Sequence, residues 1–191
     1  MIKLKIIIAS TRDGRKGPAI ADWVYQAAAA HGSFEAELLD LLKINLPFLD
    51  EPNHPRFKKY QKQHTWDWSA IIDAAEAFIV VTCEYNYGYP AALKNAFDFL
   101  FHEWTYKPVA FVSYGGPAGG TRAVQLFKPV VASMKMMPLL EAVYIPYFLK
   151  QINEAGIFVP TDQQNKDLAV MFEELKLWSE GLKTIREKKN K

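Results

Sequence analysis

The sequence predicts an α/β fold in which helices cover both faces of a five-stranded parallel sheet. Short apolar runs rich in β-branched residues alternate with helical patterns five times along the chain, and this order is typical of parallel sheets. One run, residues 78–82, is apolar throughout, as expected of a strand covered on both faces. The chain has 191 residues, which is enough for one domain and too few for two of typical size. We therefore expect a single domain over residues 1–191.

The first strand–helix–strand unit has the clearest pattern. Residues 3–9 form an apolar, β-branched run that predicts a buried strand. Pro18 then opens a helix, where proline is favoured in the first turn, and Gly32 is placed to end it. Residues 34–41 alternate apolar and polar side chains and predict the second strand. The apolar face of the helix consists of Ile20, Trp23, Val24 and Ala27.

A long polar segment separates the second strand from the third. Residues 42–66 are rich in Pro, Asn, Lys and Gln and predict an irregular segment, which at this length is often functional or covers other elements. A short helix over 68–77 and the strand 78–82 are expected next. Pro90 begins the following helix. The core face of that helix consists of Leu93, Ala96, Phe97, Leu100 and Phe101.

The last part of the chain repeats the alternation. Residues 109–113 predict the fourth strand, 121–134 a helix that contains Pro129, and 142–145 the fifth strand. A final helix has a long apolar face. That face consists of Leu168, Met171, Phe172, Leu175, Trp178, Leu182 and Ile185.

Composition excludes several classes of function. The net charge of +2 does not indicate a nucleic-acid surface, and we interpret the basic run 186–191 as a solvated helix end. No stretch approaches the roughly 18 apolar residues needed to span a bilayer. The chain has one cysteine, Cys83, and four histidines without metal-ligand spacing. We therefore expect a cytoplasmic protein without a metal site, and we interpret Cys83 as a small packed residue rather than a redox thiol.

The loops after the first and third strands are the candidate site. In a sheet of order 2-1-3-4-5, ligands bind between strands one and three, beyond their carboxyl ends. The first loop has hydroxyls at Ser10 and Thr11, charges at Arg12, Arg15 and Lys16, and glycines at positions 14 and 17. The helix that starts near Pro18 directs its positive end at the same place, which favours a phosphate. The alternative is a polar strand-to-helix turn that happens to be basic.

The second and third loops suggest a flat ring. Tyr85, Tyr87 and Tyr89 surround Asn86 and Gly88 in the second loop, and aromatic rings with backbone amides can wall a planar group. The tyrosines can equally pack at a subunit interface. The third loop is glycine-rich and either approaches a ring edge or simply precedes a helix. A phosphate site and a ring site together suggest a mononucleotide, for which FMN is the natural candidate.

These segments resemble the NADPH-dependent FMN reductase family. Ser10-Thr11-Arg12 with Gly17-Pro18 is similar to its phosphate loop, and residues 84–98 are similar to its P-x-Y-N-x-x-x-P…L-K-N-x-x-D segment. Residues 113–116 resemble its third flavin loop, and the resemblance covers roughly residues 1–150. The sequence departs from the family pattern at Ala9, often glycine, and at Cys83, usually proline.

The resemblance implies a flavodoxin-like fold, bound FMN, and hydride transfer from NADPH or NADH to a flavin, quinone, azo compound or metal oxyanion. We expect ping-pong kinetics and assign no catalytic side chain, because hydride passes directly from nicotinamide to flavin. The alternatives are a flavodoxin-type electron carrier and a non-flavin module that binds a phosphate ligand. The implied FMN-binding residues are Ser10, Arg12, Lys16, Gly17, Pro18, Glu84, Tyr85, Asn86, Tyr87, Gly88, Ser113, Gly115 and Gly116.

The expected partners are a small-molecule acceptor and further copies of the chain, with no nucleic acid or membrane. The family implies a homodimer or homotetramer. The helix after Pro90 carries Ala92 and Phe99 away from its core face, and this excess apolar surface predicts a subunit interface. Lys94 and Asp98 are spaced to form an ion pair on the same helix.

Overall fold

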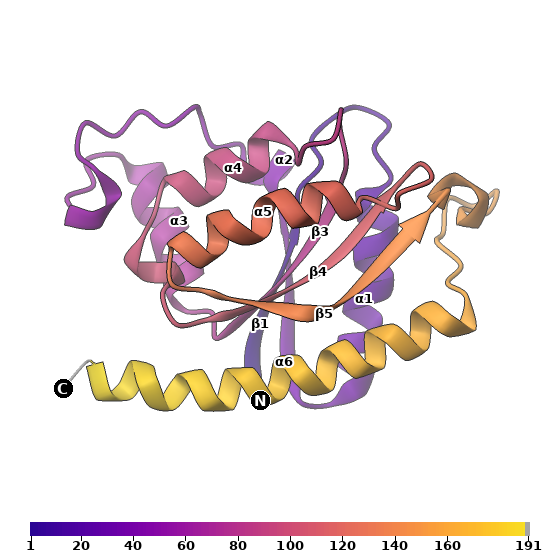
Figure 1. Ribbon diagram of the computed structural model, residues 1–191. Helices are drawn as coiled ribbons and strands as arrows, with labels where there is room; N and C mark the ends of the chain where they lie inside the picture. The colour runs from indigo at the N-terminus through magenta and orange to yellow at the C-terminus, as the bar shows by residue number, and fades with distance from the viewer. Residues whose placement is uncertain (190–191) are drawn as a thin grey trace.

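The expected sheet is present in the computed structural model, which describes residues 1–189 (Figure 1). Five parallel strands pair in the order β2-β1-β3-β4-β5, with β3 in the centre. The fold class is confirmed. Residues 190 and 191, the end of the basic run 186–191, lie outside the described residues. The strands are β1 (Ile2–Ile8), β2 (Phe34–Asp40), β3 (Ala77–Cys83), β4 (Pro108–Gly115) and β5 (Met137–Pro146).

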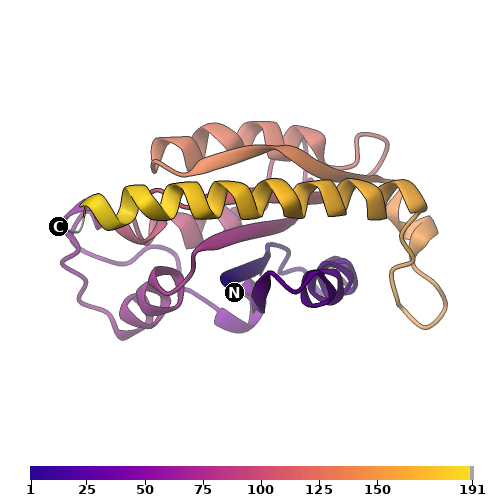
Figure 2. The same cartoon turned by 90° about the horizontal axis from the view of Figure 1, so that it is seen from below.

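Helices cover both faces of the sheet, because each strand is followed by a crossover that packs back onto it. One layer holds α1 (Gly17–His31) and α6 (Asp162–Lys189), and Figure 2 shows α6 running along the sheet. The opposite layer holds α3 (Gln63–Asp73), α4 (Ala91–Asp98) and α5 (Thr121–Ser133). The shorter elements are α2 (Leu41–Ile44) and the 3₁₀ turns Pro55–Phe57, His102–Trp104 and Phe148–Gln151.

Two elements, α3 and β5, have bounds that differ clearly from the sequence prediction. Helix α3 begins at Gln63 and ends at Asp73, whereas the pattern indicated 68–77. Its polar start is supported from outside the helix, since the Glu51 carboxylate accepts hydrogen bonds from the N–H groups of the two residues before Gln63. Strand β5 begins at Met137 rather than 142, because its first half lies at the sheet edge and leaves Leu140 exposed.

The segment 42–66 was expected to be irregular, and it is only partly so. It contains most of α2, a 3₁₀ turn and the start of α3. The carboxylate of Glu103 is fully buried beneath it and accepts hydrogen bonds from Tyr60 Oη at 3.1 Å and Ser69 Oγ at 2.6 Å. On α4, the Asn95 side chain donates to the Pro47 carbonyl at 2.7 Å. The segment is therefore fastened to the core at both ends.

The prediction that Phe99 lies on an exposed apolar face of α4 is wrong. Its side chain is fully buried, with its ring 5.7 Å from the ring of His64, so the first turn of α3 helps to cover it. The ion pair of Lys94 with Asp98 is present, with Nζ 2.7 Å from Oδ1. No helix within residues 1–189 combines the length and the apolar character needed to cross a membrane.

Candidate functional site

Three loops at the carboxyl ends of β1, β3 and β4 meet where the strand order reverses. The chain runs outward from β1 to β2 and then crosses back to β3, and in open α/β sheets ligands bind beyond the strand ends at such a point. Tyr114 Oη donates to Ser10 Oγ at 3.1 Å and joins the end of β4 to the first loop. Arg122 Nε donates to Glu84 Oε1 at 2.6 Å and joins α5 to the second loop. The loops cover residues 9–16, 84–90 and 116–120.

The first loop leaves a helix amino end without a cap. Helix α1 begins at Gly17 with Pro18 in its first turn, no side chain caps it at Lys16, and the first turn has no acidic residue. The backbone N–H groups of residues 11–14, 16 and 17 donate to no acceptor within residues 1–189. Donors of this kind at a helix amino end favour an anion. The charges of Lys16 and the exposed Arg12 lie on the same loop.

Arg15 holds the first loop in place. Its guanidinium donates to both carboxylate oxygens of Asp40 at 2.7 Å and to the Ser10 carbonyl at 2.8 Å. Burial alone would raise the pKa of Asp40, but the hydrogen bonds from Arg15 and from the Leu42 N–H lower it. Arg15 was expected to offer its charge to a phosphate. Instead its charge is used within the protein.

A tightly packed contact lies beneath the first loop. Ser10 is nearly completely buried, and its Oγ lies beside both Tyr114 Oη and Gly17. A Cβ at position 17 would stand 2.5 Å from Ser10 Oγ and 2.8 Å from Tyr114 Oη. Glycine is therefore needed at position 17 so that the start of α1 can approach these two hydroxyls.

The second loop is a tight turn that displays two aromatic rings. Tyr85 and Gly88 exchange backbone hydrogen bonds of 2.9 Å, and Asn86 and Tyr87 adopt left-handed φ values of 49° and 71°. Such a turn matches the twist of a strand pair. Tyr85 is 41% exposed and Tyr87 65%. The guanidinium carbon of Arg122 lies 3.8 Å from the centre of the Tyr87 ring and fixes its position.

Glu84 brings an unsatisfied acceptor to this loop. Its side chain is only 7% exposed and pairs with Arg122 through Oε1. The other oxygen, Oε2, is buried without a hydrogen-bond donor in residues 1–189. Because a buried carboxylate oxygen normally has a partner, this atom indicates a place where a ligand donor can bind.

Cys83 is a packed residue at the end of β3. Burial raises the pKa of its thiol, although Tyr85 and Tyr114 lie close enough to oppose that shift. Burial also raises the pKa of Tyr85, and nearby Arg12 partly offsets it, which places the first loop against the second. Within residues 1–189, no group of His, Cys, Asp or Glu side chains could hold a metal ion.

In the third loop the glycines and the serine have different roles from those expected. The Ser113 side chain is fully buried and donates to the Gly119 carbonyl at 2.7 Å, so it shapes the loop instead of facing the crevice. Gly119 and Gly120 have left-handed φ values of 58° and 82°. A Cβ on Gly115 would stand 3.1 Å from Gly120 N, whereas Gly116 is exposed with open space beside it.

The structure brings most of the predicted residues to one edge but exposes only some of them. Arg12, Lys16, the turn 85–88 and Gly116 reach the surface, whereas Ser10, Gly17 and Ser113 lie beneath it. Sequence reasoning missed Tyr114 and Arg122. Their partners are 104 and 38 residues away in the chain, so no local pattern could indicate either contact.

Comparison with known proteins gives consistent matches. The family model for NADPH-dependent FMN reductases matches residues 2–150. An NAD(P)H-dependent FMN reductase of Schizosaccharomyces pombe is 42% identical over 148 residues, covering 75% of this chain and 74% of that protein. One of Saccharomyces cerevisiae is 35% identical over 146 residues, covering 71% and 76%.

Solved structures share the fold at low sequence identity. The flavoenzyme NAD(P)H:(acceptor) oxidoreductase FerB of Paracoccus denitrificans superposes with a TM-score of 0.73 at 20% identity, covering 95% of this chain and 98% of FerB. The apo form of the NADH:FMN oxidoreductase EMOB superposes with a TM-score of 0.68 at 15% identity, covering 93% and 89%. At these identities the likeness concerns the arrangement of strands and helices.

Proposed function

The chain belongs to the NADPH-dependent FMN reductase family, and we propose that its FMN lies across the carboxyl ends of β1, β3 and β4. It is an oxidoreductase that uses FMN and NAD(P)H. Bound FMN supplies the two-electron chemistry, accepting hydride from NAD(P)H and passing electrons to the acceptor. The residues of the chain bind the flavin, orient it and set the charge around it.

The first loop fits the flavin phosphate, and this is the observation that carries the proposal. Six backbone N–H groups that have no acceptor among residues 1–189 lie beside the uncapped amino end of α1. Arg12 and Lys16 supply positive charge there, whereas Arg15 supports the loop from behind. A phosphate would accept these hydrogen bonds and interact favourably with the helix end. Ser10, Gly17 and Pro18 set the shape of the loop.

The second and third loops fit the ring. Tyr85 and Tyr87 present exposed aromatic surfaces, and Gly116 has open space where a ring edge can approach. Glu84 Oε2 lacks a donor, and an N–H of the flavin's pyrimidine ring is a donor of the kind that this oxygen needs. Ser113 and Gly115 support the ring indirectly, because both hold the third loop in its folded form.

Charge at the crevice favours reduction. The charge of Arg122 is balanced by its ion pair with Glu84, so the backbone N–H groups of Asn86 and Tyr87, which have no acceptor among residues 1–189, would provide the positive potential where negative charge develops. We propose that nicotinamide and acceptor use the same open face in turn, which gives ping-pong kinetics with flavins, quinones, azo compounds or metal oxyanions as acceptors. Initial rates at several quinone concentrations test this, because parallel double-reciprocal lines are expected and intersecting lines would refute a shared face.

An Arg12→Ala variant tests the position of the phosphate. Losing one charge-assisted hydrogen bond of about 1.5–3 kcal/mol should weaken FMN binding by about 10- to 150-fold. Riboflavin lacks the phosphate, so its affinity should be unchanged. The matched control is Lys59→Ala, an exposed cation on the segment before α3, which should alter neither affinity. Equal weakening of FMN and riboflavin would place the phosphate elsewhere.

The visible spectrum of the FMN-loaded protein tests the activity itself. After desalting, anaerobic NADPH should bleach the flavin band within seconds. A retained band that NADPH cannot bleach would favour an electron carrier, and a protein that neither retains FMN nor turns over excess FMN would favour the non-flavin module.

We also propose that the whole chain acts as one FMN-binding domain in the cytoplasm and assembles as a homodimer or homotetramer. The support for assembly comes from residues 42–62, before α3, where Phe48 is 86% exposed and Phe57 68%, since a subunit interface would bury large apolar side chains of this kind. Light scattering should give at least twice the monomer mass, and a Phe48→Ser/Phe57→Ser variant should lower it. A monomeric wild-type protein would refute assembly.

A further inference from the structure

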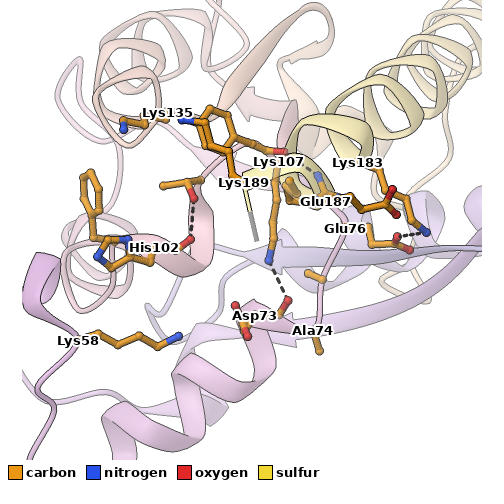
Figure 3. A pocket seen from close by; sticks show the side chains of 15 residues that line it. Lys58, Asp73, Ala74, Glu76, His102, Lys107, Lys135, Lys183, Glu187 and Lys189 are labelled. Carbon is orange, nitrogen blue, oxygen red and sulfur yellow. Dashed lines mark hydrogen bonds and ion pairs between the residues drawn. The ribbon is translucent and has the colours of Figure 1, made fainter. Parts of the chain in front are cut away.

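A hollow lies at the amino ends of the strands, at the opposite end of the sheet from the flavin loops. It is formed by residues 73–76, just before β3, and 105–107, just before β4, together with the last turns of α6 (Figure 3). Its volume is about 690 Å³, within the range of about 300–1,000 Å³ that is typical of small-molecule sites. The proposed reductase chemistry does not use it.

The hollow carries an excess of positive charge. Six basic and three acidic side chains line it. Two of the lysines have carboxylate neighbours, Lys183 with Glu76 at 3.0 Å and Lys58 with the buried Glu103 at 3.4 Å. The other acidic lining residues are Asp73 and Glu187, and the basic lining residues are Lys58, Lys107, Lys135, Lys183, Arg186 and Lys189.

Lys107 places a buried ammonium group in the wall of the hollow. Its side chain is only 4% exposed, and Nζ donates to the carbonyls of Ile72 and Asp73 at 2.8 and 2.9 Å. An ammonium has three N–H groups, so one has no protein acceptor within residues 1–189. Burial lowers the pKa of Lys107 to about 8, and the nearby carboxylates of Asp73 and Glu103 only partly offset that shift. An anion in the hollow would add negative charge close to this ammonium group.

The neighbouring cations are held around Tyr106. Arg186 Nη1 donates to the Tyr106 carbonyl at 2.6 Å, and burial lowers the pKa of this guanidinium as well. The Nζ atoms of Lys135 and Lys189 lie 5.9 and 4.9 Å from the centre of the Tyr106 ring. Within residues 1–189, neither Arg186 nor Lys135 forms an ion pair with a carboxylate. Cations from the residue before β4, from the turn after α5 and from the last turns of α6 thus line one hollow.

We propose that this hollow binds a small polyphosphate anion, separately from the flavin. The excess of basic over acidic side chains matches a ligand with several negative charges, and lysine ammonium groups bind phosphate oxygens as point charges. The ligand class is that of inorganic polyphosphates and the phosphate chains of nucleotides. The proposal does not depend on where FMN lies, because the hollow includes no residue of the three flavin loops.

Calorimetric titration of the FMN-loaded protein with inorganic tripolyphosphate tests the proposal. Loading with FMN keeps the first loop occupied, and tripolyphosphate has no ring to enter the flavin crevice. Saturable binding with a Kd of about 1 mM or tighter is expected. A Lys135→Glu variant reverses an exposed charge at the rim and should weaken binding about tenfold. Repeating the titration with ATP shows whether a nucleoside adds affinity to the phosphate chain.

The matched control is Lys166→Glu, an exposed lysine near the start of α6, about 35 Å along the helix from Lys189. It makes the same charge change and should leave the affinity within about twofold of wild type, because charges that far apart are screened. The proposal is overturned if the wild-type protein shows no saturable binding. It is also overturned if Lys166→Glu weakens binding as much as Lys135→Glu, since attraction would then follow net charge alone.

Discussion

Replacing Arg15 with methionine separates support of the phosphate loop from binding of the phosphate. The Arg15 and Asp40 side chains are 11% and 10% exposed, and two hydrogen bonds of 2.7 Å join them. Methionine keeps much of the side-chain volume but leaves the Asp40 carboxylate without its cation. Removing one partner of a buried pair costs about 3–5 kcal/mol. We expect about 3 kcal/mol at pH 7, because Asp40 keeps its hydrogen bond from the Leu42 N–H at 3.1 Å.

The loss of stability caused by Arg15→Met should be larger at neutral pH than at acidic pH. In the wild-type protein the pKa of Asp40 is lowered, so its contribution to stability is present above the unfolded-state pKa of about 3.9 and disappears as the pH falls below it. Without Arg15, burial dominates and raises this pKa. The variant then loses stability as the pH rises, by about 1.4 kcal/mol for each unit of raised pKa.

Urea unfolding followed by tryptophan fluorescence at pH 7 and pH 4 measures both effects. The difference between wild type and Arg15→Met should be clearly smaller at pH 4. The double variant Arg15→Met/Asp40→Asn removes the unpaired charge and should recover about 1–2 kcal/mol at pH 7. An equal loss at both pH values, or no recovery in the double variant, would show that the pair does not act as described.

Three further substitutions test contacts around the site and the segment before α3. Gly17→Ala should destabilise the protein by about 1–2 kcal/mol in urea unfolding, because the new Cβ overpacks against Ser10. The control Gly181→Ala, in open space on α6, should stabilise it by about 0.5–1 kcal/mol. A Gly17→Ala variant as stable as wild type would contradict the packing. Glu103→Gln should lose about 1–3 kcal/mol and speed tryptic cleavage of the segment before α3, and unchanged cleavage would mean that other contacts fasten it. Tyr114→Phe should weaken FMN binding about tenfold while unfolding changes by only about 1 kcal/mol, and an unchanged FMN affinity would remove Tyr114 from the support of the site.

Hydrophobic periodicity was sufficient to predict the parallel sheet and the helices on both faces, and the strand order is the one that the resemblance to flavodoxin-like proteins implied. Strands such as residues 78–82 are apolar because they are covered on both sides, and that requirement is visible in a single sequence. The start of β5 was missed because an edge strand needs less apolar character, as the exposed Leu140 shows. The start of α3 was missed because Glu51, twelve residues upstream of Gln63, supports it. Contacts between distant residues leave no periodic signal.

The candidate site likewise has parts that the local sequence encodes and parts that it does not. The loops could be located because the ends of strands and the composition of the loops that follow them are both encoded locally. The direction of individual side chains could not, so Ser113 was expected at the flavin and lies beneath its loop, and Phe99 was expected at an interface and lies in the core. Arg15 was predicted to offer its charge to a phosphate, because its partner, Asp40, lies at the end of a different strand and their pairing leaves no signal in the local sequence.

The order of the strands also affects how the chain folds during synthesis. β1 can pair with β2 once residue 40 has left the ribosome, but its other edge pairs with β3, which ends at Cys83. At about 5–20 residues per second, translation of the 43 residues between those points takes roughly 2–9 s. Throughout that interval an apolar strand edge is open to pairing with other chains. Synthesis that slows within the long segment before β3 should therefore lower the yield of folded protein.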